Sequence, residues 1–147
     1  MSELSVSIMR LDSSVELPSY AYEGDAGLDL RANADVVIEP YQRVLIPTGL
    51  AIAIPDGYAG FVQPRSGMAL KQGLSIANTP GLIDAHYRGE LKVIAVNLDS
   101  EKAIHIERGE RIAQLVIQQV PVVHLVEVDE LDETDRGCGG FGSSGSK

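Results

Sequence analysis

Arginine, serine and glycine follow one another in PRSG, residues 64–67, where an extended stretch meets the most helix-like part of the chain. A guanidinium such as that of Arg65 can donate two parallel hydrogen bonds to phosphate oxygens. Backbone N–H groups at the start of a helix also favour an anion, and Ser66 would add a hydroxyl. The same residues would equally suit a capping serine beside a surface arginine, so this segment alone leaves both interpretations open.

GLIDAHYRGE, residues 81–90, carries an aspartate at the predicted end of an apolar strand. Asp84 could act as a general base or accept a hydrogen bond from a sugar hydroxyl, and Tyr87 could pack on a sugar ring. The other interpretation is an ordinary polar turn with a half-buried tyrosine. A further acid, Asp29 in DAGLDL, is a candidate for holding hydrated Mg²⁺, because that ion keeps several waters and takes one or two carboxylates plus phosphates.

The last twelve residues, RGCGGFGSSGSK, hold five of the fifteen glycines of the chain. They do not match a Walker-type phosphate loop, since Ser146 stands where that motif needs lysine. Their unhindered N–H groups and serine hydroxyls could still bind a phosphate chain. Phe141, alone among glycines, suggests a ring that lies on a planar partner. A frayed terminus is the alternative interpretation.

Short segments of alternating polarity, separated by turn residues, predict an all-β sandwich or barrel around these groups. The one break is RSGMALKQG, residues 65–73, which predicts a single short helix with Ser66 as N-cap and Gly73 as its stop. Residues 91–98 are apolar on both faces, which predicts a strand buried on two sides. The predicted strands are residues 5–9, 36–39, 43–46, 50–54, 58–63, 91–98, 103–107, 111–118 and 122–128.

Length and composition fit one globular domain, since the chain has 147 residues, of which 44% are hydrophobic and 22% charged. A formal net charge of −9 argues against general nucleic-acid binding. One cysteine and three histidines give no zinc-type ligand spacing. The longest apolar run, residues 50–54, is too short to span a membrane, so we expect a cytoplasmic protein.

The acidic run DELDETD, residues 129–135, has five acids in seven residues, which is typical of a solvated linker. We therefore expect three parts: a β domain at residues 1–128, this linker at residues 129–135, and a glycine-rich arm at residues 136–147. Cys138 in the arm is interpreted as a small tolerated residue rather than a reactive thiol.

Five segments, in this order, resemble the five ordered motifs of the trimeric dUTP pyrophosphatase (dUTPase) family: DAGLDL, PRSGMALK, NTPGLIDAHYRGE, RIAQLV and RGCGGFGSSG. The resemblance covers residues 25–145, and motifs in register over most of the chain make it highly specific. It departs from the family in the arm, where GSSG stands for the commoner GSTG and keeps the hydroxyl.

The family implies a jelly-roll-like β-barrel or sandwich with a flexible C-terminal arm, and a homotrimer with shared active sites. It also implies Mg²⁺-dependent hydrolysis of dUTP to dUMP and pyrophosphate. That reaction would limit uracil incorporation into DNA and supply dUMP for thymidylate synthesis. Neither nucleic acid nor membrane is an expected partner.

The resemblance implies that Asp84 orients and polarises the attacking water and also binds the deoxyribose 3′-hydroxyl. Tyr87 would lie where a 2′-hydroxyl would have to fit, so that ribonucleotides are excluded. Uracil would be read by a hairpin-like segment whose tight pocket rejects thymine and cytosine. The residues implied for that pocket are Asn78, Gly81, Leu82 and Ile83.

The residues implied for phosphate binding are Arg65, Ser66, Gly67 and Gln114, with Lys92 as a lesser contact. Of these, Arg65 and Gln114 join Asp84 in the expected catalytic set. Asp29 would accept hydrogen bonds from water on the Mg²⁺ that the triphosphate chelates.

The arm would close over the nucleotide, with Phe141 stacked on uracil. The residues expected to wrap the β- and γ-phosphates are Arg136, Gly142, Ser143 and Ser144. Because the acidic linker can reach about 23 Å when extended, we predict that the arm covers a neighbouring subunit's site.

Two other functions share this scaffold. A dCTP deaminase, or a bifunctional deaminase–dUTPase, would need a glutamate base at the pyrimidine and a different serine–arginine pattern near the helix. A non-catalytic trimeric nucleotide-binding regulatory module would be marked by loss of Asp84 or of the arm, and both are present.

Overall fold

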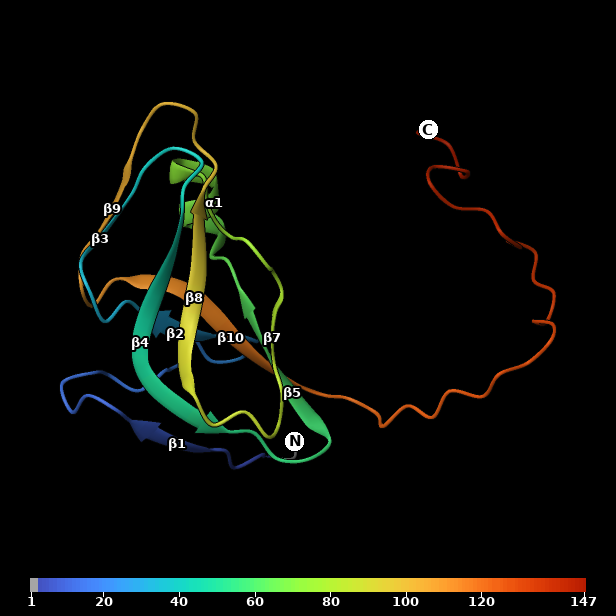
Figure 1. Ribbon diagram of the computed structural model, residues 1–147, viewed down its shortest axis with the longest axis horizontal. Helices are drawn as coiled ribbons and strands as arrows, with labels where there is room; N and C mark the ends of the chain where they lie inside the picture. Colours follow the sequence, from blue (N-terminus) through green and yellow to red (C-terminus); the bar gives the residue numbers. More distant parts are fainter. Residues whose placement is uncertain (1–2) are drawn as a thin grey trace.

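Two four-stranded antiparallel sheets form the body of the protein in a computed structural model that describes residues 3–147 (Figure 1). The first sheet has the order β1 (Ser7–Arg10), β4 (Arg43–Ala53), β8 (Glu90–Asn97), β6 (Leu74–Ile76). The second has the order β2 (Leu28–Arg31), β10 (Arg111–Gln119), β5 (Tyr58–Gln63), β7 (Gly81–Ile83). A separate pair joins β3 (Val36–Ile38) to β9 (Ile104–Ile106). Both orders are open, so the sheets form a sandwich rather than a closed barrel, and the all-β prediction is confirmed.

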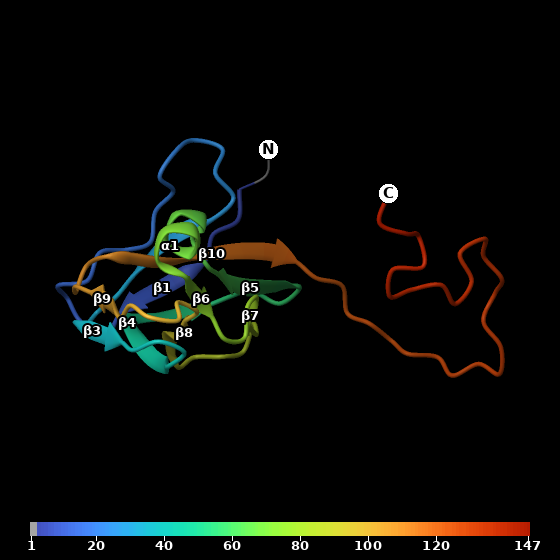
Figure 2. The same cartoon turned by 90° about the horizontal axis from the view of Figure 1, so that it is seen from above.

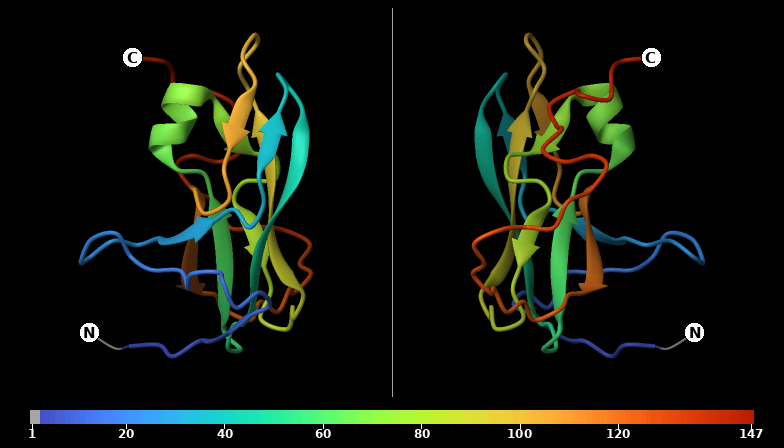
Figure 3. Two further views of the ribbon diagram at one scale, coloured as in Figure 1. Left: turned by 90° about the vertical axis from the view of Figure 1, so that its left-hand side faces the viewer. Right: turned by 90° about the vertical axis from the view of Figure 1, so that its right-hand side faces the viewer.

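The predicted short helix is α1 (Ser66–Gln72), which follows β5 after two residues. Arg65, in an extended conformation, takes the N-cap position, and no side-chain hydrogen bond caps the helix. The prediction of Ser66 as N-cap was therefore wrong, because the extended approach of the chain continues one residue further than expected. Gly73 ends the helix as predicted, in the left-handed conformation with φ of 73°. Figures 1 and 3 place α1 at the end of the sandwich opposite β1.

Apolar side chains of the two sheets meet between them and form the core. Leu30 and Leu115 come from the second sheet, Ile46 and Val93 from the first, and each is at most 2% exposed. Aligned sandwiches bury alternate residues of each strand in this way. Among the described residues, no helix has the length and apolar character needed to cross a membrane.

Strand β8 shows this alternation, with Leu91, Val93 and Ala95 buried and Lys92 and Ile94 exposed. The prediction that residues 91–98 are buried on both sides was therefore wrong for the single chain. The inward face packs against the second sheet, whereas nothing in the same chain covers the outward face in the part that the structure describes.

Among the described residues, Thr48 of β4 and Asn97 at the end of β8 are completely buried polar residues, and Asn97 links the most segments. Its amide nitrogen donates to the carbonyls of Ile38, at 2.9 Å, and Lys102, at 2.8 Å. Its oxygen accepts the backbone N–H of Asp99 at 2.8 Å. Asn97 thus ties β8 to β3 and to the loop that leads into β9.

Several elements differ from the prediction in extent. The strands predicted at residues 43–46 and 50–54 are parts of one long strand, β4, which ends at Ala53 and whose register with β8 shifts between Pro47 and Ala51. Strands β2 and β6 were missed, because they have only four and three residues and a period of two carries little signal over so short a run. The apolar strand expected to end before Asp84 is β7, which ends at Ile83.

The prediction of a strand at residues 122–128 was wrong. Strand β10 ends at Gln119, and the chain then leaves the body without pairing (Figures 1 and 2). Its alternating apolar residues are typical of a strand, but a strand needs a neighbour for its backbone hydrogen bonds. In the single chain Val122 is 96% and Leu125 88% exposed. The boundaries proposed at residues 128 and 135 stay predictions.

Candidate active site

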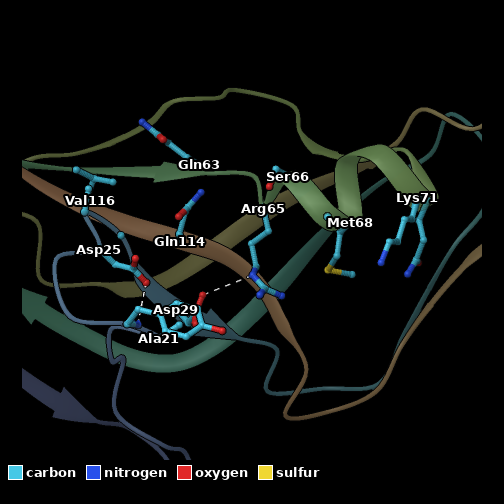
Figure 4. A pocket seen from close by; sticks show the side chains of 15 residues that line it. Ala21, Asp25, Asp29, Gln63, Arg65, Ser66, Met68, Lys71, Gln114 and Val116 are labelled. Atoms are coloured by element: carbon cyan, nitrogen blue, oxygen red, sulfur yellow. Dashed lines mark hydrogen bonds and ion pairs between the residues drawn. The ribbon is translucent and has the colours of Figure 1, made fainter.

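A cavity of about 700 Å³ is lined by the loop before β2, by strands β2, β5 and β10, and by α1 (Figure 4). The structure brings together at this cavity five residues that were predicted to bind phosphate or metal. They are Asp29, Arg65, Ser66, Gly67 and Gln114. Lys71 of α1 lines the same cavity and adds a positive charge that the sequence interpretation did not select.

Strand register explains why motifs distant in sequence meet here. Asp29 of β2 lies opposite Gln114 of β10, which in turn lies opposite Gln63 of β5. The Gln114 amide donates a hydrogen bond of 3.0 Å to the carbonyl of Pro64, just before Arg65. Since an amide carries two N–H donors, Gln114 can fix this turn and keep one donor for a ligand.

Asp29 lies between two arginines. Its Oδ1 is 3.5 Å from Nε of Arg65, and its Oδ2 is 3.7 Å from Nη1 of Arg111. The Arg65 guanidinium also donates to the carbonyl of Arg111 at 3.3 Å. The Asp29 side chain is only 14% exposed, so the carboxylate holds the Arg65 guanidinium at the cavity wall, as Figure 4 shows. Arg111 was not selected from the sequence, where its one signal is that it opens the RIAQLV motif.

A second cavity, of about 60 Å³, lies beside β7 and β8. Five of the residues that line this cavity were selected from the sequence as base, sugar or phosphate contacts. They are Asn78, Gly81, Leu82, Ile83 and Lys92. Its remaining wall is apolar, from β5, β6 and β8. The two cavities share no lining residue in the part of the chain that the structure describes.

Asp84 and Tyr87 lie on the exposed turn that follows β7. The Tyr87 N–H donates to the carbonyl of Asp84 at 3.1 Å, and the Tyr87 hydroxyl donates to the carbonyl of Glu90 at 2.8 Å. Arg88 donates to the carbonyl of Ala85 at 2.6 Å. The turn is thus held by its own hydrogen bonds, with the Asp84 carboxylate facing solvent.

The C-terminal segment lies apart from the body of its own chain (Figures 1 and 2). It holds Arg136, Phe141, Gly142, Ser143 and Ser144, and none of these residues lines either cavity. Phe141 is fully exposed. The hydrogen bonds of this segment are local turns, such as that from the Arg136 side chain to the carbonyl of Gly139 at 2.9 Å. The structure does not bring the arm together with the other predicted site residues.

The dUTPase family model matches residues 13–145. The chain belongs to the dUTPase family. A deoxyuridine 5′-triphosphate nucleotidohydrolase of Corynebacterium glutamicum is 56% identical over 146 residues, covering 99% of this chain and 98% of that protein. Among solved structures, a mutant dUTPase of Staphylococcus bacteriophage 80alpha with dUpNHpp has a TM-score of 0.90 at 32% identity. That match covers 97% of this chain and 99% of the phage chain.

A metal ion in this dUTPase would depend largely on its substrate. The described residues contain no group of three or more His, Cys, Asp or Glu that could form a preformed cage. Asp25 and Asp29 are the carboxylates at the larger cavity, and one or two carboxylates plus phosphates is a donor set that fits Mg²⁺. A structure of a mutant dUTPase from phage phi11 of S. aureus describes the coordination of a structural Mg(II) ion in that protein. It is 28% identical to this chain, with a TM-score of 0.81 over 88% of this chain and 100% of that one.

Proposed function

We propose that this chain hydrolyses dUTP to dUMP and pyrophosphate. The observation that carries the proposal is the pairing of two chemically different cavities on one sandwich. The larger cavity offers the Arg65 guanidinium, the Ser66 hydroxyl and the backbone N–H of Gly67 for binding phosphates. The smaller cavity is narrow and largely apolar, as binding of a flat base requires. Membership of the dUTPase family supports the same reaction, and the deaminase and regulatory alternatives have no comparable support.

In the proposed reaction a water oxygen bonds to the α-phosphorus, while the bond from that phosphorus to the α,β-bridging oxygen breaks and pyrophosphate leaves. Asp84 accepts a hydrogen bond from the water and takes its proton. Its exposure on the turn after β7 leaves the carboxylate accessible to water. Positioning and neutralisation of charge supply most of the rate in such a displacement, and no covalent nucleophile is required.

Arg65 and Gln114 act on the phosphates from a fixed position. Asp29 holds the Arg65 guanidinium, and the bond from Gln114 to Pro64 fixes the turn that leads to it. Ser66 and Gly67 contribute a hydroxyl and N–H groups at the first turn of α1. When bound, Mg²⁺ would neutralise phosphate charge, with Asp29 accepting hydrogen bonds from its waters. A carboxylate has about four acceptor sites, so Asp29 can keep both arginines while doing so.

Base and sugar selection are assigned to the smaller cavity and the turn beside it. Asn78 and the backbone of residues 81–83 would bond the uracil edge in this cavity of about 60 Å³, and a close fit around the base would exclude a 5-methyl group. Lys92 at its rim would reach the phosphates as a lesser contact. The Tyr87 ring, half exposed on the turn, would occupy the space that a 2′-hydroxyl needs.

We infer that three copies assemble and share each site. The separation of the two cavities on one chain supports this, because a nucleotide must contact both chemistries at once. Exposed apolar side chains support it too: Leu45 at 55% and Ile94 at 36% are direct cross-strand partners on the outward face of the first sheet. Such patches mark contact surfaces, as do the exposed valines and leucines of residues 122–128.

The arm, residues 136–147, is proposed to close a neighbouring subunit's site. Two inactive variants test this: one truncated after Asp135, the other full length with Asp84→Ala. If the arm acts in trans, mixed trimers contain sites with an intact Asp84 and an intact arm, and activity returns. Inactivity of well-mixed trimers would show that the arm acts on its own chain.

Pyrophosphate release from dUTP, with dTTP, dCTP and UTP in parallel, tests the reaction itself. We expect turnover of dUTP alone, without release of ammonia from dCTP. Ammonia from dCTP would identify a deaminase. Tight dUTP binding without turnover would identify a regulatory module.

A further inference from the structure

Gly89 lies beneath the ring of Tyr87. A Cβ atom built on Gly89 would be 2.6 Å from Cζ of Tyr87 and 2.9 Å from Cε1, and closer still to the hydroxyl oxygen. Real Cβ atoms essentially never approach other atoms below 3.0 Å. The ring in its observed position therefore requires that residue 89 carry no side chain.

The backbone does not require a glycine at this position. Gly89 is not among the glycines with positive φ, so alanine could adopt its conformation without strain. Substitution of Gly89 by alanine therefore affects only the space under the tyrosine ring. At Gly73 and Gly57, whose φ angles are 73° and 84°, the same substitution would also strain the backbone.

The ring is held in place from one side only. The Tyr87 hydroxyl donates to the carbonyl of Glu90 at 2.8 Å, which draws the ring over residue 89. The side chain is 46% exposed, so its other side is open. A group added beneath the ring would break this hydrogen bond and push the ring outward.

We propose that Gly89 is the specificity-determining positioning residue of the sugar site: the contact of its bare backbone with Tyr87 sets how far the ring projects toward the nucleotide. This rests on the proposed function, in which Tyr87 faces the deoxyribose. A ring seated on Gly89 leaves room for a 2′-hydrogen and blocks a 2′-hydroxyl. A ring raised by one methyl group blocks the deoxyribose as well.

The test is a double-mutant cycle between Gly89→Ala and Tyr87→Ala, measured on the full-length protein. In the wild-type background, Gly89→Ala should lower kcat/KM for dUTP by about 10- to 100-fold, because displacements near 1 Å cost that much in a positioned site. The loss should fall mainly on KM. The ribose of UTP already clashes with the ring in the wild-type protein, so the substitution should lower kcat/KM for UTP less than for dUTP. The ratio of kcat/KM for dUTP to that for UTP should therefore fall by about tenfold. In the Tyr87→Ala background the same substitution should change kcat/KM less than about twofold.

Tyr87→Phe separates the ring from its hydroxyl. Cζ and Cε1 remain in phenylalanine, so Gly89→Ala should still reduce kcat/KM in the Tyr87→Phe background. An equal loss in the Tyr87→Ala background would overturn the proposal, since Gly89 would then act other than through the ring. Unchanged kinetics of the single variant Gly89→Ala would overturn it as well.

Thermal unfolding provides a readout that does not depend on activity. Loss of the Tyr87–Glu90 hydrogen bond in Gly89→Ala should lower Tm by about 1–4 °C when the tyrosine is present. In the Tyr87→Ala background the change should be absent or a small increase, because alanine restricts the unfolded chain. If the wild-type protein did not hydrolyse dUTP, the proposed function and the sugar role of Gly89 would both fail, while this sign reversal would still establish the steric contact. A decrease of equal size in both backgrounds would refute the contact itself.

Discussion

Replacement of Asp29 by asparagine keeps the side-chain size and removes the negative charge between Arg65 and Arg111. At an effective dielectric constant of about 20, unit charges at the 3.5 Å separation of Asp29 and Arg65 attract by about 5 kcal/mol. The two arginine side chains are 33% and 43% exposed, so screening by solvent reduces each interaction to about 1–2 kcal/mol. Arg65 would then lose the contact that holds it against the cavity wall.

The expected result is a fall in kcat/KM for dUTP of about 10- to 100-fold. It should be carried mainly by KM, because in the proposed mechanism Arg65 binds the phosphates before the reaction begins. The assay is steady-state pyrophosphate release over a series of Mg²⁺ concentrations. Asp35→Asn is the control, since Asp35 is an exposed aspartate that lines neither cavity and accepts its hydrogen bond from the backbone N–H of Arg108.

The Mg²⁺ series distinguishes the two roles of Asp29. If anchoring of Arg65 dominates, excess Mg²⁺ should restore little of the lost activity. Complete restoration would refute the anchoring role and leave only the water-mediated contact to the metal. A kcat/KM for Asp29→Asn within about twofold of wild type would refute both.

Three further outcomes are expected. Asp84→Asn should reduce turnover by about 10²-fold or more while nucleotide binding persists, and near-normal turnover in steady-state assays would exclude Asp84 as the base. Asn97→Ala removes the partner of the buried Ile38 carbonyl and of the part-buried Lys102 carbonyl and Asp99 N–H, so chemical denaturation should show a loss of about 3 kcal/mol. Hydrogen bonds from the side chain and N–H of Ser14 lower the pKa of Asp12 from 3.8 to about 2. The stability this provides is complete above pH 3.8 and is lost toward pH 2, so Asp12→Asn should flatten the stability curve in that window.

Three residues of the larger cavity, Asp29, Arg65 and Ser66, could be selected from the sequence because their side chains suit metal or phosphate binding, whereas the family resemblance implied Gln114 and the residues selected at the smaller cavity. Arg65 and Ser66 suit phosphate, and both line the larger cavity with Gln114. Their supporting contacts could not be predicted, because those depend on strand register. That Asp29 lies opposite Gln114 and within 4 Å of Arg111 could not be inferred from the sequence.

The errors in the fold have related physical causes. Strand β6 has three residues, too few for an alternation to be recognised. Residues 122–128 have the alternation but no partner strand, and pairing is a property of two segments rather than one. The outward face of β8 was expected to be buried because its side chains are apolar; in one chain Ile94 stays 36% exposed.

Closure of the arm can be related to the chemistry that it would cover. Phe141 is fully exposed, and burial of its ring on a base would contribute about 1.5–3 kcal/mol. Ordering the glycine-rich backbone costs about 1–2 kcal/mol for each residue fixed. Stacking on uracil alone would therefore not hold the arm closed, so the proposed closure depends on contacts from Arg136, Ser143 and Ser144 to the β- and γ-phosphates. The product dUMP keeps the base but has lost both of these phosphates, so on this proposal hydrolysis would remove the interactions that keep the arm in place. The arm would then strengthen binding of dUTP but not of dUMP, and product release would need no additional conformational switch.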